Sequence, residues 1–150
     1  MSSAGDGQAY VYTLSLRHQR DGAAMAFLIL AMRIGTAAVW IVSGLVFKVL
    51  HLVPRHQTIV ADVLGDAVAG PMTLLIGGAE IVMGIWILSR WRPRTCAMAQ
   101  TIAIVSMNAL ELTFAKDHLL APLPMVCANC VFLAVGWYLA LHTRTQSRSW

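Results

Sequence analysis

The sequence predicts an all-α membrane protein: a bundle of four transmembrane helices, with a short amphipathic surface helix between the first and the second. Three observations support this fold class. The chain has 150 residues, of which 58% are hydrophobic and only 12% are charged, whereas soluble domains average about 25% charged residues. Four apolar stretches are each long enough to cross a bilayer. Glycines, prolines and arginines separate these stretches from one another.

The four transmembrane segments follow from the length of the apolar stretches. A span needs roughly 20 apolar residues, and the segments that meet this requirement are residues 23–50, 71–89, 95–114 and 120–142. Gly70-Pro71 opens the second segment, and Pro122 and Pro124 lie in the first turn of the fourth, where proline disturbs a helix least. We therefore expect one transmembrane domain, residues 23–142, between polar tails at residues 1–22 and 143–150.

Residues 56–70, between the first and second spans, have a different pattern. The charged residues Asp62 and Asp66 fall on one helical face, and the apolar residues recur on the other with a period near 3.6. These apolar residues are Ile59, Val60, Val63, Leu64, Ala67 and Val68. The pattern predicts a short helix that lies on the membrane surface or caps the mouth of the bundle. An irregular loop is the alternative.

The basic residues of the loops predict the orientation of the chain. One side of the membrane holds Arg17, Arg20, Arg90, Arg92, Arg94, Arg144 and Arg148, and the other holds only Arg55 and Lys116, with Lys48 at a helix end. Positive residues favour the cytoplasm, so we expect both tails to be cytoplasmic. Topology also explains the formal net charge of +4, and we expect no nucleic-acid partner.

Four ionisable residues inside the spans are the strongest functional signal, because a charge in hydrocarbon is expensive. At about 1.5 Å per residue, Arg33 and Glu80 each lie roughly 14 Å from the cytoplasmic side. Lys48 and Glu111 lie near the opposite ends of their spans. Matched depth therefore predicts two buried charge pairs, Arg33 with Glu80 and Lys48 with Glu111.

A polar pocket is predicted around the second of these pairs, near the outer face of the membrane. Its candidate members are His51, His56, Gln100, Asn108, His118 and Asn129. Gln100, Asn108 and Glu111 fall on one helix face, and Arg33, Trp40, Gly44 and Lys48 form one stripe on the first span. Two interpretations stay open: the charges only determine which helices pack together, or they form a proton relay, an ion site or a site for a quinone head group.

The cysteines predict little chemistry. Cys127 and Cys130 form a C-x-x-C near the start of the fourth span, where a helix N-terminus favours a reactive thiol. Such a pair resembles that of the vitamin K epoxide reductase family, which also needs a second cysteine pair or a partner that supplies one. The third cysteine, Cys96, is expected at the other side of the membrane. Small apolar packing is the favoured interpretation. We predict no metal site and no covalently bound cofactor.

Three sequence blocks resemble the DoxX-like family of small four-helix inner-membrane proteins. The first span reads Trp40-Ile-Val-Ser-Gly44-Leu-Val-Phe-Lys48, and the second has Gly77-Gly-Ala-Glu80-Ile-Val-Met-Gly84-Ile-Trp86. Gln100, Asn108, Glu111 and Ala128-Asn129 follow in order. The resemblance implies a four-helix bundle in a bacterial inner membrane. The family's charged positions correspond here to Arg33, Lys48, Glu80 and Glu111, and the C-x-x-C is not part of its pattern.

The resemblance also implies an association with oxidoreductases, since one similar protein is the membrane subunit of a thiosulfate:quinone oxidoreductase. We therefore expect a membrane subunit in an electron-transfer complex, not catalytic alone, with membrane lipid and a redox protein as partners and quinone as the candidate ligand. The alternative is a non-catalytic subunit that only assembles or stabilises a larger complex. A transporter is the third hypothesis, and no internal repeat in the sequence supports it.

Overall fold

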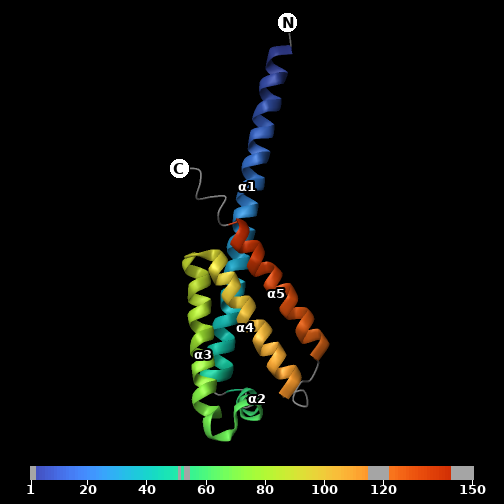
Figure 1. Cartoon of the computed structure of the whole chain (residues 1–150). Coiled ribbons are helices and arrows are strands. Elements are labelled where there is room, and N and C mark those ends of the chain that lie inside the picture. Colours follow the sequence, from blue (N-terminus) through green and yellow to red (C-terminus); the bar gives the residue numbers. More distant parts are fainter. Residues whose placement is uncertain (1–2, 51, 53–54, 115–121, 143–150) are drawn as a thin grey trace. The chain divides into compact units, whose positions relative to one another are not determined.

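Every element that the computed structural model describes is a helix (Figure 1). The described residues are 3–50, 52, 55–114 and 122–142. The elements are α1 (Ser3–Val42), the π-helix η1 (Ser43–Val49), α2 (Arg55–Leu64), α3 (Asp66–Ser89), α4 (Pro93–Phe114) and α5 (Pro122–His142).

The chain divides into two compact units, Met1–Met32 and Arg33–Trp150. In the first unit, the described residues belong to the beginning of α1. The second unit contains the rest of α1 and all other elements. All contacts and cavities considered below lie within this second unit.

The predicted fold class is confirmed. Four helical segments are long and apolar enough to cross a membrane: Leu14–Val49, Asp66–Ser89, Pro93–Phe114 and Leu123–His142. They correspond in order to the four spans expected from the sequence. The protein is therefore a multi-pass membrane protein whose described part is all-α.

Two helix starts differ from the prediction. α1 is helical from Ser3, within the segment expected to be a polar tail. α3 begins at Asp66, with Pro71 inside the helix. Gly65 explains the second difference, because its φ of 89° lies in a region that glycine adopts at little cost and other residues avoid. The chain therefore turns at Gly65, and Pro71 follows too late to begin the helix.

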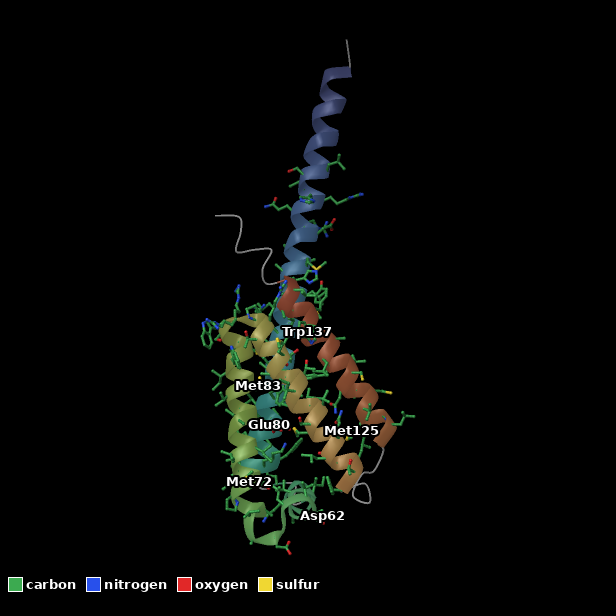
Figure 2. All side chains as sticks on the ribbon, in the orientation of Figure 1. Asp62, Met72, Glu80, Met83, Met125 and Trp137 are labelled. Atoms are coloured by element: carbon green, nitrogen blue, oxygen red, sulfur yellow. The ribbon has the colours of Figure 1, made fainter. Side chains whose placement is uncertain are left out.

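The predicted amphipathic helix exists as α2, although it ends at Leu64 and the remaining residues of the segment belong to α3. Ile59 is buried, whereas Asp62 is exposed, as the alternation of apolar and charged faces predicts (Figure 2). α2 packs against α3 and also contacts η1 and α4. Of the two predicted positions, capping the bundle is the one that the contacts support.

The second unit buries several polar side chains and exposes many apolar ones. Arg33, Thr36, Lys48, Thr73, Glu80 and Gln100 are buried. Large apolar side chains such as Leu75, Ile102 and Val131 are about two thirds exposed, at 64%, 65% and 65%. This distribution fits a chain whose outer surface faces lipid, since hydrocarbon tolerates exposed leucine but not exposed charge.

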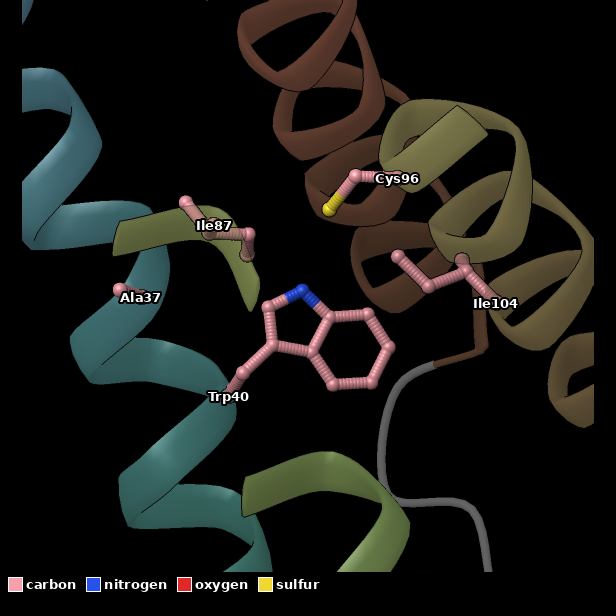
Figure 3. Close-up of a cluster of buried hydrophobic side chains, with 5 residues drawn as sticks. All are labelled: Ala37, Trp40, Ile87, Cys96 and Ile104. Carbon is pink, nitrogen blue, oxygen red and sulfur yellow. The ribbon is translucent and has the colours of Figure 1, made fainter. Parts of the chain in front are cut away.

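A small apolar cluster forms the core of this unit (Figure 3). The Trp40 ring lies at its centre, with Ala37, Ile87, Cys96 and Ile104 around it. These residues come from α1, α3 and α4, so the cluster joins three of the four spans. Phe132 of α5 packs against it, with its ring centre 6.2 Å from that of Trp40.

The closest helix contact joins η1 to α3 at two glycines. A Cβ placed on Gly77 would lie 2.8 Å from the carbonyl oxygen of Gly44 and 2.9 Å from Lys48 Cβ. A Cβ placed on Gly44 would collide with the Gly77 carbonyl oxygen. Small residues let transmembrane helices approach in this way. The contact also determines how far Lys48 lies from α3.

The Gly77 contact predicts a difference between two adjacent glycines. We expect Gly77→Ala to lower the free energy of unfolding by about 1–3 kcal/mol, because the new methyl group pushes η1 and α3 apart. Gly78 has no atom within 4 Å of the equivalent position. Gly78→Ala should therefore be neutral or stabilise the helix by up to about 1 kcal/mol. Unfolding of both variants in detergent micelles tests this, and equal destabilisation would contradict it.

Candidate functional site

The site begins with the π-helix η1, which continues α1 through Ser43–Val49. The Leu50 amide donates to the Leu45 carbonyl oxygen at 2.8 Å, five residues earlier instead of four. Such wider turns are rare and occur often at functional sites. Here the wide turn brings Ser43 and Lys48, five residues apart, onto one face, and Lys48 Nζ lies 3.4 Å from Ser43 Oγ.

A buried ion pair joins η1 to α3. Lys48 Nζ lies 2.7 Å from Glu80 Oε1 and 2.8 Å from Glu80 Oε2. The two side chains are only 4% and 5% exposed. Glu80 lies about midway along α3 (Figure 2), and the Lys48 side chain reaches it because helical side chains lean toward the helix N-terminus. A buried pair with both carboxylate oxygens occupied avoids the cost of an isolated charge.

The predicted pairing of Arg33 with Glu80 is therefore wrong. Glu80 lies beside Gly44, since the Cβ positions of these two residues are 3.0 Å apart. Arg33 is eleven residues from Gly44, or roughly 16 Å along the helix, which is too far for its side chain. The prediction counted the depth of Arg33 from assumed ends of the span. This placed Arg33 at the wrong level relative to Glu80, because glycine contacts determine the register of α1 and α3.

The predicted pairing of Lys48 with Glu111 is corrected in the same way. Lys48 donates to Glu80, and Glu111 instead lines two cavities on either side of that ion pair. The predicted stripe on the first span is confirmed, since Arg33, Trp40, Gly44 and Lys48 are all buried.

The larger of these cavities, here called the central cavity, has a volume of about 260 Å³. Its polar lining comes from Ser43, Glu80, Asn108, Glu111 and Asn129. The remaining lining residues are Val39, Trp40, Ile104, Met107, Ala128 and Phe132. The cavity thus combines two aromatic rings and a mostly apolar wall with a few polar groups, which is the usual composition of a small-molecule site.

Two side-chain hydrogen bonds organise the amides around this cavity. Asn129 Nδ2 donates to Asn108 Oδ1 at 2.7 Å, which ties α5 to α4. With its oxygen used in this way, the Asn108 side chain has its NH₂ group as the donor for a ligand. Trp40 Nε1 donates to Gln100 Oε1 at 3.2 Å. Gln100 therefore holds the Trp40 ring, which lines the central cavity, but does not line this cavity itself.

The smaller cavity, here called the α2 cavity, has a volume of about 110 Å³. Ile59, Val60, Val63 and Leu64 of α2 form one wall, and Lys48, Ile76, Met107, Leu110 and Glu111 line the rest. Lys48 thus borders the α2 cavity and Glu80 the central cavity, while Glu111 borders both. Three ionisable groups therefore line one or both of these spaces.

The other predicted pocket members divide into two groups. Asn108 and Asn129 line the central cavity. His51 and His118 lie outside the described residues, and for His56 only the backbone, in α2, is described. The predictions for these three histidines therefore stay predictions.

The cysteines lie apart from both cavities. Cys127 and Cys130 are free and exposed on α5. Cys96 is buried at the other end of the α4–α5 pair, beside Gln100. Within the described part of the chain, no three His, Cys, Asp or Glu side chains are arranged to hold a metal ion.

Sequence reasoning missed Ser43, Met107 and Phe132 as cavity residues. Ser43 could not be found, because a regular α-helix would place it on a different face from Lys48. Met107 and Phe132 are apolar residues in apolar spans, and nothing in their spacing separates them from residues that face lipid. Only packing reveals that they line a cavity.

A comparison with protein families matches the part of the chain that contains this site. The model of the DoxX-like family matches residues 37–137, which is more than half of the chain and includes all residues lining the two cavities. No curated protein and no solved structure matches the chain.

The ion pair predicts a specific pattern of stabilities. Lys48→Met or Glu80→Leu alone should lower the free energy of unfolding by about 3–5 kcal/mol, since each leaves one buried charge without its counter-ion. The double variant should recover most of this loss, because it contains neither charge. Unfolding of the wild type, the two single variants and the double variant in detergent micelles completes this double-mutant cycle. Additive losses in the double variant would show that the two charges do not stabilise each other.

Proposed function

Because the chain belongs to the DoxX-like family, we propose that it is the membrane subunit of an oxidoreductase or electron-transfer complex, and that its central cavity binds the head group of a quinone. The observation that carries the proposal is the lining of this cavity. It places an amide donor and a carboxyl group in a largely apolar space between membrane-spanning helices.

The size of the cavity favours a single ring over a larger ligand. Its volume of about 260 Å³ lies just below the range of small-molecule sites, which span roughly 300–1,000 Å³. The rings of Trp40 and Phe132 provide flat apolar surfaces for a quinone ring. The Asn108 amide supplies a hydrogen-bond donor for one of its carbonyl oxygens.

The carboxyl groups supply the proton part of the reaction. Reduction of a quinone to a quinol consumes two electrons and two protons, and both protons end on the ring oxygens. Glu111 is the lining carboxyl group that does not form the Lys48–Glu80 ion pair, and we assign it the role of proton donor to the ligand. The electrons come from a redox partner protein, the class of partner that the family resemblance implies.

Proton supply to Glu111 is assigned to the α2 cavity. Glu111 borders this cavity together with Lys48 and the apolar face of α2. Water in this space would connect Glu111 to the membrane surface on the α2 side. The sequence predicts that this side is the outer face of a bacterial inner membrane, with both termini in the cytoplasm.

A second candidate function is that of a structural subunit without a ligand. The observation that favours it is the position of the ion pair at the tightest helix contact, Gly44 with Gly77. In this case the charges would specify only how η1 and α3 pack. A change at Glu111 distinguishes the two candidate functions, because Glu111 lines the central cavity but does not take part in the Gly44–Gly77 contact.

The quinone proposal predicts that one carboxyl-to-amide change lowers quinone-linked turnover and that another leaves it unchanged. Glu111→Gln should lower quinone-linked turnover of the native complex by about 100-fold, within the range for loss of a general acid, while the complex still assembles. Asp62→Asn is the matched control, since Asp62 is exposed on α2 and lines neither cavity. Quinol formation by membranes from each strain, with the partner enzyme's donor supplied, measures both.

Binding gives a second test that does not depend on the electron donor. Asn108→Leu should weaken binding of a short-chain quinone to the purified protein by about tenfold, the value of one hydrogen bond to a ligand. Tryptophan quenching of the native protein, which has Trp40 beside the cavity, provides the signal. Unchanged turnover in Glu111→Gln and unchanged binding in Asn108→Leu would exclude the quinone site and leave the structural function.

A further inference from the structure

The central cavity has an opening on the outside of the bundle, between α1 and α5. Val39 of α1 and Ala128 of α5 line the cavity and are also exposed, whereas its other lining residues are buried or half-buried. The closely packed helix pairs of the described chain are η1 with α3, α2 with α3 and α4 with α5, and α1 with α5 is not one of them. Figure 1 shows the beginning of α5 apart from α1. Val39 and Ala128 therefore form the rim of the opening.

This rim lies at a depth where the surroundings are hydrocarbon. Val39 precedes the end of η1 at Val49 by ten residues, or roughly 15 Å along the helix. Ala128 follows the start of α5 at Pro122 by six residues, or roughly 9 Å. Both residues belong to segments that can span a membrane, whose hydrocarbon core is about 30 Å thick. The opening therefore faces acyl chains, and a ligand that uses it comes from the lipid phase.

The polarity of the lining changes between the interior of the cavity and the rim. Glu80 comes from α3, and Asn108 and Glu111 come from α4. None of these three side chains belongs to an exposed residue. The two rim residues, on α1 and α5, have apolar side chains. A molecule with a polar ring and a long apolar chain matches this arrangement, with its ring toward α3 and α4 and its chain between α1 and α5.

We propose that the ligand is a long-chain quinone whose apolar tail leaves the central cavity between Val39 and Ala128 and lies in the bilayer; this rests on the quinone site proposed above. The cavity volume of about 260 Å³ suits a ring but leaves little room for a long tail. The α2 cavity is a poorer place for the tail, because it is smaller, at about 110 Å³, and is bordered by Lys48 and Glu111. A tail in the bilayer stays in hydrocarbon and needs no cavity in the protein.

The test compares two quinones with the same ring, one with a decyl tail and one without a tail, bound to the full-length protein in lipid nanodiscs. Ala128→Phe and Val39→Phe each add bulk at the rim. Each should weaken binding of the tailed quinone by about tenfold, a usual effect of overpacking. Binding of the tail-free quinone should change by less than about twofold, as for most substitutions of exposed residues.

Val131→Phe is the matched control, since Val131 is 65% exposed on the same helix as Ala128 but does not line the cavity. Its binding of both quinones should equal that of the wild type. Quenching of tryptophan fluorescence measures binding, because none of the three variants adds a tryptophan. Both rim residues are exposed, so neither change disturbs the core. If one rim variant fails to fold, the other, on a different helix, still decides the question.

The wild-type protein separates a failure of the tail route from a failure of the proposed function. If neither quinone binds the wild type, the quinone site itself is excluded. If both bind and neither rim variant weakens the tailed quinone, the site stands and the route between α1 and α5 is overturned. Equal weakening of both quinones, or an equal effect of Val131→Phe, would also overturn the route. Selective loss of the tailed quinone in the rim variants supports it.

Discussion

The buried ion pair between Lys48 and Glu80 imposes conditions on everything packed around it. Two charges between membrane-spanning helices are tolerated only in direct contact, and this contact requires η1 and α3 to approach closely. Gly44 and Gly77 permit the approach because neither has a side chain. The π-helical turn then places Lys48 toward α3 and beside Ser43. Helix register, backbone irregularity and glycine placement are thus linked by one electrostatic requirement.

The same ion pair affects which polar groups line each cavity of the bundle. By neutralising Glu80, Lys48 leaves the central cavity with Glu111 and two asparagine amides as its other strongly polar groups. On the other side of the Trp40–Gln100 hydrogen bond, Arg33 and Arg90 line a separate small cavity of about 30 Å³. Acidic groups and amides thus line one space, and basic groups line the other. Apolar side chains cover the outside.

The fold was largely predictable because its signals are local. The length of the apolar stretches is enough to identify four spans, and the alternation of apolar and acidic residues is enough to identify α2. The error in the start of α3 was also local in origin. Gly65 begins α3 five residues earlier than Gly70-Pro71 suggested, since a glycine with positive φ gives no stronger signal in the sequence than any other glycine. Helical periodicity relates residues within one helix, and Asn108 and Glu111 both line the central cavity.

The sequence by itself determined the membrane fold, the family, and the presence of ionisable residues within the spans. Each of these depends on composition or on spacing within one segment. Only the tertiary structure decided which charges meet: Glu80 with Lys48 instead of Arg33, and Arg33 beside Arg90. Contacts between helices depend on their relative register to within one turn, about 5.4 Å. Close glycine packing and a π-helical turn set this register here, and neither can be derived by counting residues from the membrane surface.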